Sequence, residues 1–564
     1  MFRDRAVLVS VLLLTVLAYL PLAGADFAWD DVALVADNKY TSSFEHWREL
    51  ITADLWLTTR LPAPASGYYR PLLLLDLTLD QTLFGLDPAA HHVHSVLWHL
   101  FAVGGLWTLL RRLLPGATVA VALGTVIFAL HPLQIEAVAL IAARNDSMAA
   151  ALGLFALVML ERRAPSPPRL AAGAVLAWLA LLSKESAVLL PFFLLSLDLA
   201  RHRRPLGWAR YAALVTSLVA YLGCRVAAGV GRAAVPSMSS IEAVADKVLH
   251  IASVYAGLVV WPWPLTPARH ISYLPPLGAS LFGLVVLLGI VTWLVRQERA
   301  RGLVLAGLAW AALSFAPTLL ATLDKGLMGE RYLYLPLAGL AVAVAAAVPA
   351  TLRLQHVALL ALVGSIGVRE RVGDWASSLT LWEAAHADAP SAFTHAGLAH
   401  YLRVQAKDPE RARAHYIGAL EGDPPYTDAC SSLILVHLQL GQPERALHYG
   451  LWALEERGCQ PTADVLEHLA LAYAQLGRWD EAEAAALKTG RGAFAHEMVV
   501  LGACASRRAD WEAVSRLQAA YPGEQYIERV IALLARTDDP AGDALAALAQ
   551  RASSASGSKS ASGN

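Results

Sequence analysis

The chain has 564 residues, of which 56% are hydrophobic and only 16% are charged. Soluble domains are about 45–50% apolar and about 25% charged, so the composition excludes an ordinary soluble protein. The formal net charge of -1 provides no general basic field, which argues against nucleic acid as a partner.

Apolar blocks separated by short polar loops run from Met1 to about Arg371. Because a spanning helix needs about 20 apolar residues, we expect an all-α polytopic bundle with about eleven spans. The expected spans are 6–23, 93–113, 117–134, 147–161, 170–184, 187–200, 209–226, 277–295, 302–322, 332–350 and 354–370. The first could be a signal peptide, but the later spans favour a retained helix. The short stretch His250–Val260 predicts an interfacial or re-entrant helix, with a twelfth span as the alternative.

Four cationic loops decide the expected orientation. They cover residues 111–112, 161–169, 201–210 and 296–301. With a cytoplasmic N-terminus and about eleven spans, the positive-inside rule places all four in the cytoplasm, whereas a twelfth span would move the last one outside. The C-terminal part of the chain is then extracytoplasmic. The Arg- and Ala-rich composition and the short loops favour a bacterial inner membrane, with an endoplasmic reticulum membrane as the alternative.

The loops expected to face outward collect ionisable side chains. They hold Asp30, Asp31, Glu136, Arg144, Asp146, Lys184, Glu185, Glu330 and Arg331. Ionisable groups at the edges of spans are costly unless they are paired or in use, so the sequence predicts one polar site at the outer membrane surface.

The adjacent carboxylates Asp30 and Asp31 follow the first expected span. One of them can be a general base that takes a proton from an acceptor hydroxyl, or both can bind a divalent metal through oxygen. A helix N-cap in a solvated loop is the structural alternative. His92 and His99 share a helix face with two further histidines nearby, which suggests a metal cluster or interfacial hydrogen bonding.

The cations of the outer loops are candidates for binding a phosphate. Arg331 offers a bidentate fork and Lys184 a point charge. Structural alternatives exist for both loops: Lys184 can pair with Glu185, and Arg144 can pair with Glu136.

Beyond Ala389 the sequence repeats with a period of about 34 residues, which is typical of tetratricopeptide repeats (TPR). The repeated units are 408–414, 441–447, 477–483 and a weaker one at 509–513. Such helix pairs stack into a solenoid whose concave face binds peptides, although a spacer or dimerisation arm is possible. We therefore expect a membrane domain at 1–371, an extracytoplasmic repeat domain at 372–540 and a partly disordered tail at 541–564. Cys430, Cys459 and Cys504 are expected to be unpaired core cysteines, with one disulfide as the alternative.

Several short stretches resemble one family when taken in order. They are 27–31, Tyr69–Leu72, His131-Pro132 with Glu136, Arg144 with Asp146, Lys184-Glu185, Glu330–Tyr334 and 374–382, followed by the repeats. This series resembles the transmembrane and tetratricopeptide-repeat (TMTC) O-mannosyltransferases and their bacterial relatives, of the GT-C superfamily. Gln134, Ser95 and Asn145 depart from the usual pattern, which bears on the sugar and the acceptor more than on the reaction type.

The resemblance implies inverting transfer of a sugar, often mannose, from a polyprenyl-phosphate carrier to a hydroxyl outside the cytosol, here of protein Ser/Thr recruited by the repeats. It implies catalytic roles for Asp30, Asp31 and Glu136. The implied donor-phosphate ligands are Arg331, Lys184, Arg144 and Arg70, and the implied supporting residues are Asp146, Glu185, Glu330, His92 and His131. A divalent metal, Mg or Mn, is a further candidate, with Asp31 and His92 as its ligands.

Two other functions stay open from the sequence. The chain could be a non-catalytic membrane scaffold whose repeats bind a partner. A transporter of lipid-linked sugars would place its ionisable residues near the membrane midplane, whereas here they lie at the ends of spans.

Overall fold

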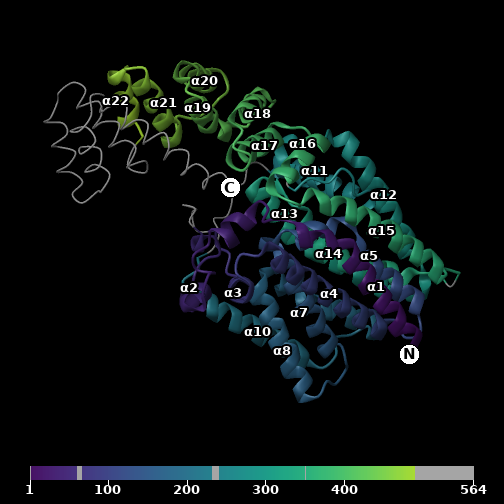
Figure 1. Cartoon of the computed structure of the whole chain (residues 1–564). Helices are drawn as coiled ribbons and strands as arrows, with labels where there is room; N and C mark the ends of the chain where they lie inside the picture. The colour runs from purple at the N-terminus through teal and green to yellow at the C-terminus, as the bar shows by residue number, and fades with distance from the viewer. Residues whose placement is uncertain (1, 60–65, 232–240, 268, 350, 490–564) are drawn as a thin grey trace. The chain divides into compact units, whose positions relative to one another are not determined.

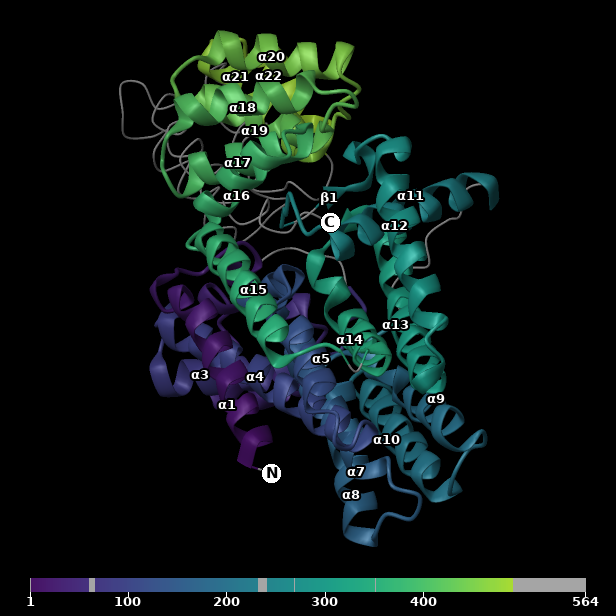
Figure 2. The same cartoon turned by 90° about the vertical axis from the view of Figure 1, so that its right-hand side faces the viewer.

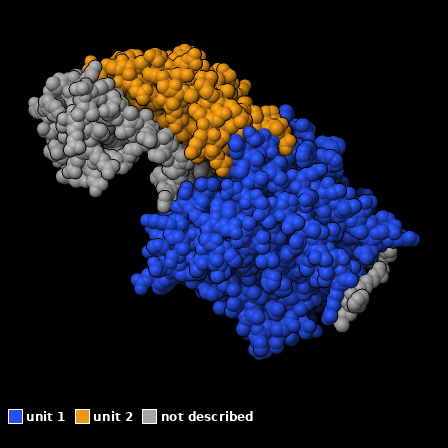
Figure 3. All heavy atoms as spheres, viewed as in Figure 1, with its two compact units in different colours: residues 1–384, 564 blue, residues 385–563 orange. Residues whose placement is uncertain are grey.

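The computed structural model describes residues 2–59, 66–231, 241–267, 269–349 and 351–489. These residues form two compact units that divide after Ala384 (Figure 3). Both units are almost entirely helical (Figure 1).

Unit 1 contains fifteen helices and part of a sixteenth among its described residues. They are α1 (Phe2–Tyr19), α2 (Trp47–Thr52), α3 (Pro71–Phe84), α4 (Pro88–Leu113), α5 (Thr118–Leu130), α6 (Ile135–Ala139), α7 (Arg144–Leu160), α8 (Pro167–Ser183), α9 (Leu190–His202), α10 (Trp208–Ala227), α11 (Ile241–Val260), α12 (Leu277–Val295), α13 (Arg301–Lys325), α14 (Tyr334–Ala347), α15 (Leu354–Asp374) and α16 (Ser378–Asp388), the last running across the division. Two short strands, β1 (Arg269–His270) and β2 (Leu327–Met328), pair antiparallel.

Six helical segments are long and apolar enough to cross a membrane. They are Asp4–Gly24, Pro88–Leu113, Ile141–Leu160, Leu277–Val295, Arg301–Leu323 and Glu330–Ala347. The pair Thr118–Leu130 and Pro132–Ala139 is bent by 51° and would make a seventh span. Helices lie at the other expected positions too, but they do not pass the same test of length and composition, so the count of about eleven spans stays a prediction.

Helix α11 is longer than the sequence suggested, because it begins at Ile241 and runs for 20 residues. It packs along α12, where Gly257 and Gly283 face each other so closely that a Cβ on Gly283 would lie 2.4 Å from the Cα of Gly257. Small residues at a helix crossing permit this approach. The pairing with α12 is therefore set by two glycines, and it leaves the choice between an interfacial helix and a span open.

The core of unit 1 is built around α7, whose residues are buried along nearly its whole length. It packs against α4 and α8, and α5 packs against α14 (Figures 1 and 2). Alanine and glycine let these backbones approach: a Cβ on Gly124 would lie 2.8 Å from the carbonyl oxygen of Ala341. Close packing of this kind holds the helix ends, and the loops between them, in fixed positions.

Short helical turns connect the helices of unit 1, and Glu185, Glu330 and Arg331 are the ionisable residues of the predicted site that lie on them. These turns are η1 (Leu20–Gly24), η2 (Val32–Ala36), η3 (Phe44–His46), η4 (Trp56–Thr58), η5 (Pro132–Gln134), η6 (Ile141–Ala143), η7 (Glu185–Leu189), η8 (Ile271–Tyr273), η9 (Glu298–Ala300) and η10 (Glu330–Leu333).

The described part of unit 2 is a series of helix pairs. They are α17 (Ala392–Val404) with α18 (Pro409–Glu421), α19 (Cys430–Gln439) with α20 (Pro443–Glu456), and α21 (Ala463–Gln475) with α22 (Trp479–Leu487), with the turn η11 (Thr427–Ala429) before α19. Each second helix starts where the repeated sequence predicts, and successive pairs contact one another. The tetratricopeptide assignment itself stays a prediction. The weak unit 509–513 and the tail 541–564 lie outside the described residues.

Two cysteines of unit 2 form a disulfide. Cys430 begins α19, and Cys459 follows α20 at a turn where Gly458 has a φ of 72°. The expectation that both are unpaired was therefore wrong. The stacking of the helix pairs explains this pairing. Cys459 lies just before α21, the first helix of one pair, and this segment lies beside the start of α19, the first helix of the preceding pair. Cys224 is free, and Cys504 lies outside the described residues.

Candidate active site

Asp30 and Asp31 have different surroundings although they are adjacent. Trp29 precedes them in the left-handed region, with a φ of 51°, and its amide donates to the hydroxyl of Ser378 at 2.8 Å. A bulky residue rarely adopts this conformation, so the neighbouring contacts must hold the chain in this bend. Asp31 then points inward and is fully buried, whereas Asp30 keeps contact with solvent.

The Asp31 carboxylate is occupied by backbone groups. Its Oδ1 accepts from the amide of Ala142 at 2.7 Å and its Oδ2 from the amide of Ala28 at 3.4 Å. Burial raises the pKa of Asp31 to about 7, although these hydrogen bonds lower it. Asp31 thus joins the loop after α1 to the loop before α7, which is a structural role.

Asp30 is the more accessible of the two carboxylates. Burial raises its pKa to about 6, and the nearby Arg331 guanidinium opposes that shift. No hydrogen bond to the Asp30 side chain is found among the described residues. A partly exposed carboxylate with a pKa near neutrality has the properties of a general base.

Arg331 is held by Glu136. Glu136 lies on α6 and is buried, while Arg331 lies on η10. The backbone amide of Arg331 donates to Oε2 of Glu136 at 3.0 Å, and its guanidinium donates to Oε1. The guanidinium also lies 5.6 Å from the ring of Trp29 and 5.4 Å from that of Tyr332. Glu136 and two aromatic rings therefore fix the direction of this cation.

Two further cations have carboxylate partners. Lys184 Nζ donates to Oδ1 of Asp146 at 2.5 Å. Arg70 lies between α2 and α3 and pairs with Glu185 at 3.0 Å. The structural alternative in which Lys184 pairs with Glu185 was wrong, because each of these neighbours reaches a different helix end.

Arg70, Lys184 and Arg331 form one cationic group. The pKa of Lys184 is lowered chiefly by burial, and also by the positive charges of Arg70 and Arg331, so the three act on one another. The side chains of Arg70, Lys184 and Arg331 are 13%, 15% and 20% exposed to solvent, so that an anion can reach each of them. Three partly exposed cations in one group suit a phosphorylated substrate.

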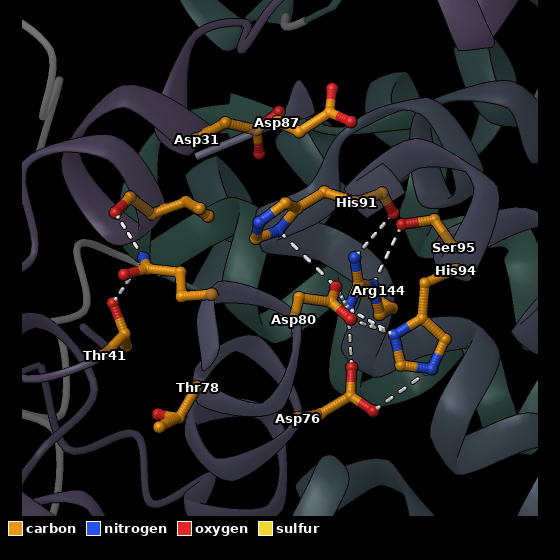
Figure 4. Close-up of polar contacts among 12 residues, drawn as sticks. Asp31, Thr41, Asp76, Thr78, Asp80, Asp87, His91, His94, Ser95 and Arg144 are labelled. Carbon is orange, nitrogen blue, oxygen red and sulfur yellow. Dashed lines mark hydrogen bonds and ion pairs between the residues drawn. The ribbon is translucent and has the colours of Figure 1, made fainter. Parts of the chain in front are cut away.

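Arg144 lies elsewhere, in a buried cluster with carboxylates from α3 (Figure 4). Its guanidinium is fully buried and lies 2.6 Å from both Asp76 and Asp80. It also donates to Ser95 at 2.9 Å and to the carbonyl of His91 at 2.7 Å. The Arg144 guanidinium is paired and, unlike the three cations above, has no exposed surface, so we leave Arg144 out of the donor-phosphate ligands. The structural alternative in which Arg144 pairs with Glu136 was wrong.

Sequence reasoning missed Asp76 and Asp80, because the stretch from residue 24 to residue 92 reads as one outward loop. The signal was present: the two carboxylates are four residues apart in an apolar run, which places them on one face of a helix. Their buried charge requires a cation, and Arg144 supplies it.

The predicted histidines make structural hydrogen bonds. His92 Nε2 lies 3.2 Å from the carbonyl of Asp26, and His99 lies 2.7 Å from the hydroxyl of Tyr334. His131 accepts from the amide of Leu133 at 3.3 Å as a cap of η5. Glu330 also makes a structural hydrogen bond, because its carboxylate accepts from the backbone amide of Thr266 at 2.6 Å.

The donor sets within the described part of the chain bear on the expected metal. Two groups there have the geometry to hold an ion, Asp76–Asp80–His94 and His386–His395–His415, and neither contains Asp31 or His92. The first group already holds the Arg144 guanidinium, which occupies the place of a cation. Asp31 accepts backbone amides instead. A Mg or Mn ion on Asp31 and His92 thus stays a prediction to which this geometry adds nothing.

A small, mostly apolar cavity of about 20 Å³ lies beside Asp146, the partner of Lys184. Its walls come from α7, η7, α9, α13 and α14 and include Gly153, Leu190, Phe193, Trp310 and Leu335. This volume has room for about one water molecule, so the cavity in this structure is too small for a hydrocarbon chain.

The chain is similar in sequence to proteins named protein O-mannosyl-transferase. It is 35% identical over 147 residues to tmtc2 of Xenopus laevis, which is 26% of this chain and 17% of that protein. It is 34% identical over 140 residues to human TMTC2, covering 25% and 17% of the two chains, and 30% identical over 191 residues to Tmtc1 of Drosophila melanogaster, covering 33% and 22%. The matched stretches thus span about a fifth of these relatives.

These matches confirm the resemblance to the TMTC O-mannosyltransferases. No protein-family model matches the chain, and no solved structure matches it.

Proposed function

We propose that the chain is a membrane-embedded glycosyltransferase that moves a sugar, mannose in preference, from a polyprenyl-phosphate carrier to a hydroxyl of an extracytoplasmic acceptor, protein Ser/Thr above all. One observation carries the proposal: the accessible carboxylate of Asp30 lies near the guanidinium of Arg331, which belongs to the cationic group with Arg70 and Lys184. The names of the relatives point to the same reaction.

In this proposal Asp30 is the general base. It takes the proton of the acceptor hydroxyl while the hydroxyl oxygen forms a bond to the anomeric carbon of the sugar. The bond from that carbon to the phosphate oxygen breaks, and the polyprenyl phosphate leaves with the electron pair. A single displacement inverts the anomeric configuration. The raised pKa of Asp30, about 6, suits a base that must be ionised yet still attract a proton.

The cationic group stabilises the departing phosphate. Arg331 and Arg70 offer planar forks and Lys184 a compact charge, and the negative charge on the leaving group grows as the bond breaks. Glu136, Glu185 and Asp146 hold these cations before the donor arrives, so little rearrangement is needed.

The helix pairs of unit 2 are proposed to recruit the protein acceptor outside the cytosol. Their disulfide between Cys430 and Cys459 supports an oxidising compartment, because disulfides seldom persist in the cytosol. A bacterial periplasm and an endoplasmic reticulum lumen both meet this requirement.

The test is sugar transfer by the purified full chain in detergent, with polyprenyl-phosphate-mannose and polyprenyl-phosphate-glucose as donors. Wild type should release polyprenyl phosphate, and Asp30→Asn should not. Asp37→Asn makes the same chemical change at an exposed carboxylate of the same loop region, so it serves as the matched control. Loss of transfer after addition of a chelator would show that the reaction needs a divalent metal. A wild type that is inert with both donors would favour the non-catalytic scaffold. An Asp30→Asn variant as active as wild type would show that Asp30 is not the base.

A further inference from the structure

Three histidines meet in unit 2, and none of them belongs to the residues proposed for sugar transfer. His386 comes from the last turn of α16, His395 from α17 and His415 from α18. Each offers a ring nitrogen, and the three nitrogens lie within 4.8 Å of one another. Three separate helices thus bring imidazoles to one point, and all three side chains are only half-buried.

The arrangement of the rings favours a shared ligand. Nδ1 of His395 lies 3.0 Å from Nδ1 of His415, and the rings of His386 and His395 have centroids 4.1 Å apart. In a tetrahedral zinc site, Zn–N bonds of about 2.0–2.1 Å place two nitrogens about 3.3 Å apart. Small ring rotations would therefore bring all three nitrogens to one ion.

Two features of the surroundings support such a site. Gly418 faces His395, and a Cβ there would lie 2.9 Å from its ring, so glycine leaves the space that the imidazole fills. Nδ1 of His386 lies 3.3 Å from the hydroxyl of Thr394, which is itself fixed in the capping box at the start of α17. Metal-binding histidines are commonly oriented by such a second contact on the other nitrogen.

We propose that His386, His395 and His415 bind one divalent transition-metal ion, with Zn²⁺ as the best fit, and that this ion joins the last turn of α16 to the first helix pair. Imidazole nitrogen suits Zn²⁺, Cu²⁺ and Ni²⁺ rather than Mg²⁺. A three-histidine set leaves a fourth position for water or another ligand. The site contains none of the residues proposed for sugar transfer, so it is structural or regulatory for unit 2.

The experiment measures metal binding by the full chain in detergent. The protein is stripped with a chelator, dialysed against Zn²⁺, and its zinc content is measured by mass spectrometry. Wild type should hold about one more zinc per chain than His395→Asn, because three nitrogen ligands are needed. His448→Asn, which changes an exposed histidine of α20, should bind as wild type does.

Two further measurements keep the test sharp. Co²⁺ in place of zinc should give a visible d–d absorption in wild type and not in His395→Asn. Gly418→Ala keeps all three ligands but crowds His395, so it should weaken zinc binding at least tenfold while the metal-free protein still folds. Zinc bound equally by wild type and His395→Asn, or absent from wild type at micromolar zinc, would overturn the proposal.

Discussion

Arg331 donates twice to Glu136, from its backbone amide at 3.0 Å and from its guanidinium, although the two residues are 195 positions apart. The first bond fixes the turn η10 on α6, and the second directs the guanidinium. In the proposed function Glu136 therefore positions the cation of Arg331, whereas the resemblance implies that Glu136 is a catalytic carboxylate. Because the two bonds use different atoms of Arg331, substitution can separate them.

Arg331→Lys should weaken use of the donor. Lysine keeps the backbone bond and the charge but loses the fork that binds a phosphate through two hydrogen bonds. A charge-assisted hydrogen bond contributes about 1.5–3 kcal/mol, so kcat/KM for the donor should fall roughly tenfold to hundredfold. Steady-state kinetics at varied polyprenyl-phosphate-mannose measure the effect. Unchanged kinetics would place the phosphate elsewhere, and Arg413→Lys, on a partly exposed pair in unit 2, is the control.

Asp30→Asn and Asp31→Asn should fail in different ways. Asp30→Asn removes the base but leaves the backbone contacts, so activity should fall by about 10²–10⁴ with little change in thermal stability. In Asp31→Asn the side-chain NH₂ group faces a backbone N–H, and two donors cannot bond to each other. One buried backbone N–H is then left without an acceptor, which lowers the free energy of unfolding by about 1–3 kcal/mol. Transfer assays and thermal unfolding, run on both variants, separate the two roles. An active Asp30→Asn together with an inactive, stable Asp31→Asn would reverse the assignment.

Transfer should depend on pH through Asp30. Burial raises the pKa of Asp30 to about 6, and only the ionised carboxylate accepts a proton. The rate should therefore be constant above about pH 7 and fall about tenfold per pH unit below about pH 6. Initial rates with saturating donor between about pH 5 and about pH 8, in buffers of constant ionic strength, give the profile. A rate that does not change across the acid half of this range would argue against this carboxylate as the base.

Much of the candidate site was accessible from the sequence. Asp30, Lys184 and Arg331 were singled out because ionisable residues at span ends need a partner or a use, and the structure brings their loops together. Their partners were not accessible, because Glu136–Arg331 and Lys184–Asp146 join residues far apart in the chain. Spacing predicts neighbours along one helix, and these pairs depend on how different helices pack.

The fold shows the same division. The repeat period located the second helices of unit 2, since repeated local sequence forms repeated local structure. The interior of the membrane part was harder: α3 was missed because its 14 residues are too few for a span. The disulfide was missed because Cys430 and Cys459 become neighbours only when one helix pair stacks on the next.

Removing the Cys430–Cys459 disulfide should loosen unit 2. The cysteines are separated by 29 residues, and a loop of this size predicts a loss of about 3–4 kcal/mol in the free energy of unfolding. Thermal unfolding of Cys430→Ser/Cys459→Ser against wild type measures it, with Cys224→Ser as control because that cysteine is free. Alkylation of both thiols in freshly purified protein, without a reductant, would show that the disulfide does not form.

Arg144→Met should destabilise unit 1 more than any change at the cationic group. It leaves the buried carboxylates of Asp76 and Asp80 without their cation, and breaking a buried ion pair in this way costs about 3–5 kcal/mol. The triple variant Arg144→Met/Asp76→Asn/Asp80→Asn removes the unpaired charges as well, so it should recover part of the lost stability. Thermal unfolding in detergent compares both with wild type. If Arg144→Met were instead stable and bound a divalent ion, Asp76, Asp80 and His94 would form a metal site that the guanidinium normally fills.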